Sequence, residues 1–200
     1  MLNLKETLEL TDEQKNIIQS LEPLTKECWD KHETKLRKAI RSSLISLQNN
    51  FCVYCGCPVH GLEDVEHIAH KATYPQFLFT PKNLVYSCKM CNQTYKGRTD
   101  IVVHVDSDYE KCSFSIVHPY LDDVDHFFDT TKIAIQIRHG LNPQEQRRAK
   151  NTYKLLHWND SAVLSRRAEA AMAQKYTEIT GTSITQVLYE NTLTYKPGIL

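Results

Sequence analysis

Four of the seven cysteines in the chain form two C-x-x-C pairs, Cys52/Cys55 and Cys88/Cys91. Two such pairs are typical of a tetrahedral zinc site with four thiolate ligands. A site of this kind is closed, so it stabilises the fold and does not activate water. The separation of the two pairs exceeds the usual roughly 15–20 residues. The segment between them must therefore leave the metal and return to it, and any chemistry must come from this insertion.

The insertion contains a carboxylate directly before a histidine, Glu66-His67, and then Asn83, and Asn92 follows the last zinc cysteine. Hydrolysis of a phosphodiester needs an activated water, a divalent cation and stabilisation of the leaving oxygen. A histidine suits the first task because it titrates near neutral pH. Carboxylate and amide oxygens suit a hard cation such as Mg²⁺. The ordered set therefore predicts metal-dependent phosphodiester hydrolysis.

The stretch from Cys52 to Gly97 resembles the HNH, or ββα-metal, endonuclease family. The family pattern is C-x-x-C, Asp/Glu-His-Ile, Asn-Leu, C-x-x-C-His/Asn and Lys-Gly. The resemblance implies that His67 is the general base and that Asn83 fixes the loop that aims it. The fold that it implies is a two-stranded hairpin and a helix around the catalytic metal, with the four cysteines as a separate zinc anchor.

The same resemblance makes Glu66 and Asn92 ligands of a catalytic Mg²⁺ or Mn²⁺, and it places Lys96 and Arg98 near the phosphate. The helix of the family fold is expected to begin near residues 91–92. This chain departs from the commoner pattern in three places: Glu66 stands for Asp, Asn92 stands for the final His, and His70 stands where Pro is frequent. His70 is either a further metal ligand or an ordinary loop residue.

The resemblance extends more weakly to residues 118–127 and 149–167, which are similar to HNH subunits of bacterial antiphage-defence systems of the Septu and retron-associated type. It implies a DNA substrate, with RNA as the alternative, and a partner subunit such as an ATPase. A competing hypothesis is a catalytically silent zinc-ribbon module that binds nucleic acid or protein.

We expect an α+β fold in which the ββα-metal core, residues 51–100, lies between an N-terminal helical region, 1–50, and a C-terminal α+β extension, 101–200. Thr11 and Gln14 have the form of a capping box, and a second helix is expected over about 25–48. Its buried stripe would be Trp29, Leu36, Ile40, Leu44 and Leu47. Strands are expected over 101–105, 113–117 and 132–138, and helices over about 144–157 and 161–177.

Several sets of charged residues, and some cysteines and histidines, allow two interpretations. The basic residues of the second helix form either a solvated face or a phosphate-contacting face; they are Lys31, Lys35, Arg37, Lys38 and Arg41. The acidic run is either a solvated face or loop cap, or a contact for a basic partner subunit; it comprises Asp122, Asp123, Asp125 and Asp129. Cys57 and His60 are weaker candidates for the zinc. We expect Cys28, Cys112, His118 and His126 to be structural.

The balance of basic and acidic residues bears on how the protein could bind nucleic acid. The chain has 24 basic and 24 acidic residues and a net charge of zero, which argues against a protein that coats nucleic acid along its whole surface. A local basic patch could still hold a substrate. No apolar run approaches the roughly 18 residues that span a bilayer, and the charged N-terminus does not resemble a signal peptide. We therefore expect a cytoplasmic protein.

Overall fold

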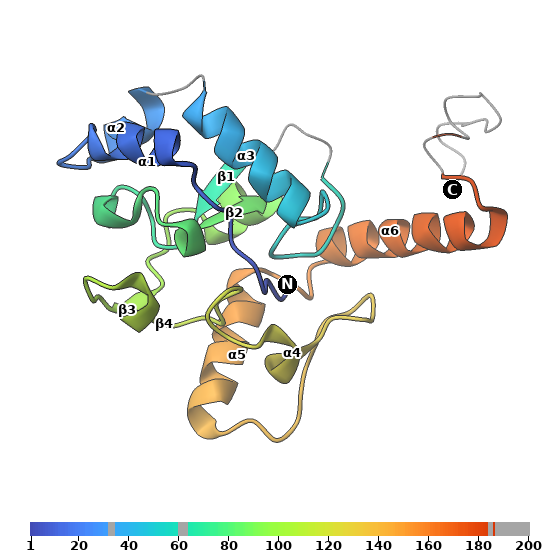
Figure 1. Cartoon of the computed structure of the whole chain (residues 1–200). Coiled ribbons are helices and arrows are strands. Elements are labelled where there is room, and N and C mark those ends of the chain that lie inside the picture. The colour runs from blue at the N-terminus through green and yellow to red at the C-terminus, as the bar shows by residue number, and fades with distance from the viewer. Residues whose placement is uncertain (32–34, 60–63, 184–185, 187–200) are drawn as a thin grey trace.

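The computed structural model describes residues 1–31, 35–59, 64–183 and 186. They form an α+β structure of mostly short elements, with three two-stranded antiparallel sheets and helices at both ends of the sequence (Figure 1). The buried apolar side chains form one hydrophobic core, to which all three predicted regions contribute. None of the described helices has the length and apolar content needed to cross a membrane.

The N-terminal region contains three helices: α1 (Asp12–Gln19), α2 (Lys26–Lys31) and α3 (Leu36–Leu47). The predicted capping box of α1 is confirmed, because Thr11 and Gln14 each accept a hydrogen bond from the backbone N–H of the other. The single helix predicted over 25–48 is described as two, α2 and α3. Its apolar stripe is buried as predicted, except that the last member is half-buried.

The central sheet pairs β1 (Asp64–His67) with β2 (Leu84–Ser87), and His67 lies opposite Leu84. Two single-turn 3₁₀ helices precede β2: η1 (Pro75–Phe77) and η2 (Pro81–Asn83). Each begins with proline, whose missing N–H is not needed at a first helical position. The helix expected near residues 91–92 is η3 (Met90–Lys96), which is of π type. The order is therefore strand, strand, helix.

Helix α3 packs against β1 and β2 (Figure 1). Gln48, which directly follows α3, is buried and bonds to β2 with its side-chain amide. Its Nε2 donates to the carbonyl of Tyr86 at 2.7 Å, and its Oε1 accepts from the N–H of Tyr86 at 2.8 Å. The amide therefore satisfies both backbone groups of Tyr86, as a residue of a neighbouring strand would do, and fixes α3 on the sheet.

The C-terminal part adds short strands and two long helices. Its elements are β3 (Val102–His104), η4 (Tyr109–Lys111), β4 (Ser113–Phe114), α4 (Val124–Phe127), β5 (Phe128–Asp129), β6 (Gln136–Ile137), α5 (Pro143–Leu155) and α6 (Ser161–Thr180). The two predicted closing helices are confirmed, and α6 projects away from the rest of the molecule (Figure 1). The last 14 residues lie outside the described part.

The strand predicted over 132–138 is mostly wrong, because only Gln136–Ile137 pairs as a strand. Arg167 on α6 explains the difference. Its guanidinium donates to the carbonyls of Thr130, Lys132 and Ile133 at 2.7–2.8 Å. These carbonyls are satisfied by a side chain, so they need no partner strand.

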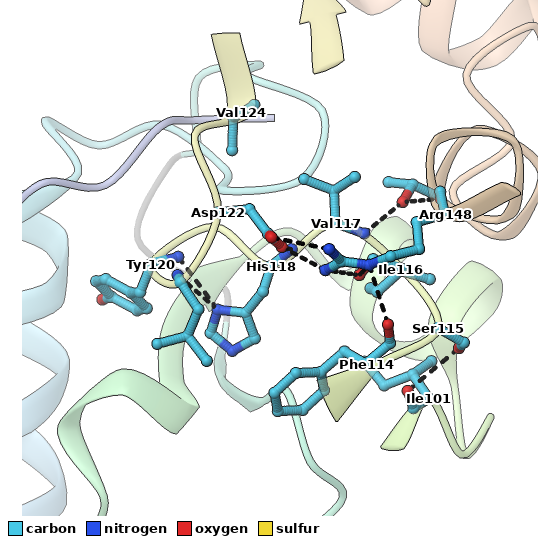
Figure 2. Close-up of polar contacts among 12 residues, drawn as sticks. Ile101, Phe114, Ser115, Ile116, Val117, His118, Tyr120, Asp122, Val124 and Arg148 are labelled. Atoms are coloured by element: carbon cyan, nitrogen blue, oxygen red, sulfur yellow. Dashed lines mark hydrogen bonds and ion pairs between the residues drawn. The ribbon is translucent and has the colours of Figure 1, made fainter. Parts of the chain in front are cut away.

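A buried polar network joins α5 to the loop after β4 (Figure 2). The guanidinium of Arg148 donates to both carboxylate oxygens of Asp122 and to the carbonyls of Phe114 and Ile116. One carboxylate oxygen of Asp122 also accepts from the backbone N–H of His118 at 2.6 Å. Asp122 is therefore a half-buried structural partner of Arg148, whereas Asp123 and Asp125 of the acidic run are exposed.

The imidazole of His118 is completely buried, and its hydrogen bonds fix its tautomer. Nδ1 accepts from the backbone N–H groups of Tyr120 and Leu121 (Figure 2). Nε2 therefore carries the proton, and it lies 3.0 Å from the hydroxyl of Tyr109. Burial lowers the pKa of His118 to about 3, so the ring is neutral near physiological pH.

This burial predicts a pH dependence of stability. Unfolded His118 binds a proton near pH 6.5, whereas the folded ring stays neutral down to about pH 3. The unfolded state therefore gains protons first as the pH falls, and the free energy of unfolding decreases below pH 6.5. A His118→Gln variant lacks this contribution, which is about 1 kcal/mol between pH 7 and pH 5.5. Urea unfolding over this range should give a flatter curve for the variant, and parallel curves would contradict the assignment.

Candidate metal centre and catalytic cleft

The four paired cysteines meet at one point. The sulfur atoms of Cys52, Cys55, Cys88 and Cys91 all lie within 4.8 Å of one another, and all four residues are buried. A zinc ion about 2.3 Å from each of four sulfurs would place the sulfurs roughly 3.8 Å apart. The sulfurs of Cys55 and Cys88 are 3.9 Å apart. The cluster therefore has the dimensions of a tetrahedral site and could hold a zinc ion.

The surroundings of the cluster suit thiolates that bind a cation. Burial raises the pKa of the Cys52 thiol, so a positive charge is needed to hold the thiolate form there. The backbone N–H of Cys88 donates to the sulfur of Cys52 at 3.3 Å, and Arg166 donates to the sulfur of Cys88 at 3.4 Å. Hydrogen bonds of this kind orient metal ligands and balance their charge.

The remaining cysteines lie outside the four-sulfur cluster. Cys57 is buried, and its sulfur lies 4.0 Å from the carbonyl of Cys55. Cys28 and Cys112 are buried thiols that bond to neighbouring backbone groups, as expected. His60, the other candidate ligand near the first pair, lies outside the described residues.

The cluster predicts one tightly held zinc per chain. Metal analysis of the purified protein should find it, and Cys88→Ala should lose both the zinc and the fold. Structural zinc contributes on the order of 10 kcal/mol in small zinc domains, which exceeds the stability of most domains. Cys112→Ala is the matched control, since it removes an equally buried thiol outside the cluster. Full zinc content in Cys88→Ala would contradict the assignment.

A cleft of about 520 Å³ lies beside the central sheet, and it brings together residues from α2, α3, β1, the loop after β1 and η3. Glu66 and His67 come from the end of β1, Asn92 comes from η3, and His70 comes from the loop after β1. Helix α3 forms another wall. Glu66, His67 and Asn92 therefore line one cavity, although they are up to 26 positions apart in sequence, whereas Asn83 is not among its lining residues.

The imidazole of His67 is held in one orientation. Its Nε2 lies 3.1 Å from the carbonyl of Leu78, and because a carbonyl can only accept, Nε2 must donate. The lone pair is therefore on Nδ1. The ring also meets the edge of Trp29, with the ring centroids 4.5 Å apart. Burial lowers the pKa of His67 to about 3, so the ring is neutral near physiological pH.

Asn83 is completely buried and bonds to the loop that follows His67. Its Oδ1 accepts from the N–H of Ala69 at 2.7 Å, and its Nδ2 donates to the carbonyls of Ala69 and Phe77. The hydroxyl of Tyr109 also donates to Oδ1 at 2.9 Å. Asn83 therefore closes the loop from residue 69 to residue 77, which ends beside the carbonyl that holds His67.

Glu66 has a buried cationic partner. The Nζ of Lys96 lies 2.6 Å from Oε1 of Glu66, without the angular geometry of a hydrogen bond, and it donates to the carbonyl of His67 at 3.2 Å. Lys96 is 1% exposed, so it lies in the interior and not on the surface where a phosphate contact was predicted. Burial raises the pKa of Glu66, although the ammonium of Lys96 acts in the opposite direction.

The donors at this end of the cleft fit a divalent cation in chemical type. Glu66 offers a carboxylate, whose Oε1 lies 2.6 Å from the Nζ of Lys96, and Asn92 offers an amide oxygen from a half-buried side chain. Oxygen ligands of this kind are preferred by Mg²⁺. Arg98 is exposed and is not among the residues that line the cleft.

Three contacts at the site were not expected from the sequence. Trp29 was assigned to an apolar stripe, but it also touches the ring of His67. Tyr109 carries no motif, yet its hydroxyl bonds Asn83 and lies beside the ring of His118. Lys96 was expected near the phosphate from the resemblance, but it is buried beside the carboxylate of Glu66, and lysine is seldom buried without such a partner.

Two curated proteins are similar to part of the chain. A Septu protein, PtuB, of Bacillus thuringiensis is 41% identical over 56 residues, which are 26% of this chain and 22% of that protein. Protein ea31 of Escherichia phage lambda is 36% identical over 77 residues, which are 38% of this chain and 23% of that protein. The chain thus spans less than a quarter of the length of each relative. No protein-family model matches the chain.

The buried pair of Glu66 and Lys96 predicts an asymmetric response to mutation. Lys96→Met leaves a buried carboxylate without its cation and should cost about 3–5 kcal/mol of unfolding free energy in buffer without added Mg²⁺ or Mn²⁺. The double variant Glu66→Gln/Lys96→Met should lose less than the single variant, because no buried charge remains. Chemical denaturation of the four proteins of this cycle measures the coupling. Additive losses would show that the two side chains do not interact.

Proposed function

We propose that the chain is a metal-dependent endonuclease of the HNH type that hydrolyses phosphodiester bonds in DNA, with RNA as the alternative substrate. The observation that carries this proposal is the arrangement of the cleft. His67 lies there as a neutral imidazole with its Nε2 proton bonded to Leu78, beside the carboxylate of Glu66 and the amide of Asn92.

Each side chain has a role that its surroundings support. His67 takes a proton from water at Nδ1, and the bond to Leu78 keeps the other nitrogen protonated. Asn83 acts as a positioning residue, because it bonds the loop that carries this contact. Glu66 and Asn92 would hold the catalytic Mg²⁺ or Mn²⁺, which neutralises charge on the phosphate when bound. The four cysteines hold the structural zinc and take no part in the reaction.

The biological setting is also proposed. The partial likeness to the Septu protein supports a role in bacterial antiphage defence. The resemblance of the downstream segments supports a subunit that works in the cytoplasm beside an ATPase. One observation favours the alternative, a silent zinc-ribbon binding module: Lys96 already supplies a positive charge to Glu66. A cleavage assay separates the two.

His67→Ala should lower the rate of plasmid cleavage by a factor of about 10²–10⁴, because it removes the general base. The assay uses Mg²⁺ and Mn²⁺ in separate arms, with zinc content measured on the same samples. His104→Ala is the matched control, since His104 is an exposed histidine outside the cleft. A His67→Ala protein that cuts at the wild-type rate would contradict the proposal. Wild-type protein that cuts neither DNA nor RNA, with the partner present, would favour the silent module.

A further inference from the structure

One wall of the cleft is strongly basic. Arg37, Lys38 and Arg41 of α3 line the same cavity as His67, and Lys71 lines it from the loop after β1. Arg41 lies three residues after Lys38 and four after Arg37, so the three cations share one side of the helix. The surface formed by Arg37, Lys38 and Arg41 is called the α3 wall below.

The α3 wall is unfavourable for the helix alone. Helix α3 contains no carboxylate, and its first turn carries cations at the end where the helix dipole is also positive. Arg37 and Arg41 are like charges four residues apart, which destabilises a helix by several tenths of a kcal/mol. Among the described residues, no carboxylate pairs with Arg37 or Lys38. A solvated face would not need this concentration of one charge, whereas an anionic ligand would offset it.

The two guanidinium groups are also held in place. The Cζ of Arg37 lies 5.4 Å from the ring centroid of Trp29, and that ring contacts His67. The Cζ of Arg41 lies 5.6 Å from the ring of Tyr86, whose hydroxyl accepts a hydrogen bond from it. Groups that are already ordered lose less conformational entropy when they bind a ligand. The α3 wall is therefore prepared for an anion next to the candidate general base.

The zero net charge of the whole chain is compatible with a locally cationic α3 wall. The acidic residues of the cleft are partly neutralised, since Glu66 is paired with Lys96. Helix α3 itself carries three cations and no carboxylate, whereas eight of the 24 acidic residues lie over residues 6–33 and seven over residues 106–129. A neutral chain can therefore still present a local cationic surface to a polyanion.

We propose that the α3 wall binds the sugar–phosphate backbone of the nucleic acid and brings a phosphodiester to His67. The inference rests on the proposed function. It assigns substrate binding to helix α3 of the N-terminal region, in addition to the residues of the zinc-anchored core. The ligand is recognised by its phosphates, so binding by the α3 wall does not depend on base sequence.

The test measures binding without cleavage. Fluorescence anisotropy of a labelled DNA duplex, and of an RNA duplex of the same sequence, is recorded with His67→Ala protein over a series of salt concentrations. Adding Arg37→Gln, Lys38→Gln and Arg41→Gln should weaken the affinity by on the order of tenfold or more. It should also reduce the slope of log K against log salt by about 0.9 for each lost contact with duplex DNA.

Two controls isolate the α3 wall. The first replaces the exposed α5 cations Arg147, Lys150 and Lys154 with Gln, and it should leave the slope unchanged. Helix α5 lies at the opposite side of the molecule from α3 (Figure 1). The second, Arg37→Lys/Arg41→Lys, keeps the charge and should keep the slope. If the triple α3 variant loses its zinc or its cooperative unfolding, the exposed Lys38→Gln alone should lower the slope by about 0.9.

The outcomes are distinct. Equal slopes for the α3 and α5 variants, or failure of the His67→Ala protein to bind either duplex, would overturn the inference. Binding that depends on the α3 wall, combined with wild-type protein that never cleaves, would support the inference while the proposed catalytic activity fails. Tighter binding of one duplex than the other identifies the source of the phosphodiester.

Discussion

The hydrogen bonds of Asn83 hold together the region in which the candidate chemistry lies. The side-chain amide can donate twice and accept twice, and all four bonds are made inside the protein. Three of them fix the loop between Ala69 and Phe77, and one joins this loop to Tyr109. The carbonyl of Leu78 follows directly, so the orientation of His67 depends on this one buried amide.

A second set of hydrogen bonds supports those of Asn83. The hydroxyl of Tyr109 accepts a hydrogen bond from the Nε2–H of His118, and the loop of His118 is held by Asp122 and Arg148. A chain of buried and half-buried polar groups, each with a hydrogen-bond partner, therefore runs from α5 to the loop beside the cleft. In a low-dielectric interior each member is costly to leave unpaired, so such a network favours one arrangement over all others. The C-terminal extension thus does more than cover the core, since it fixes the position of residues in it.

The sequence predicts the parts of this structure that depend on local spacing. The two C-x-x-C pairs, the capping box of α1, the two closing helices and the apolar stripe at Trp29 and Leu36 are all read from neighbouring residues. The meeting of Glu66, His67 and Asn92 at one cleft could be expected only through the resemblance. The burial of Lys96 could not be predicted from the sequence, because it depends on the carboxylate of Glu66, which lies 30 positions earlier in the chain. The role of Arg167 was hidden for the same reason: its four acceptors are backbone carbonyls, which carry no signal in the sequence.

Arg167 also has a consequence for the order of folding. It donates to the carbonyl of Cys55 at 2.6 Å across a separation of 112 residues, and also to the loop at 130–133. Long-range contacts of this kind close large loops and form slowly. During synthesis on the ribosome, the first cysteine pair emerges long before α6 does. The turn that carries this cysteine pair must therefore wait for the C-terminal half of the chain before its backbone contacts are complete.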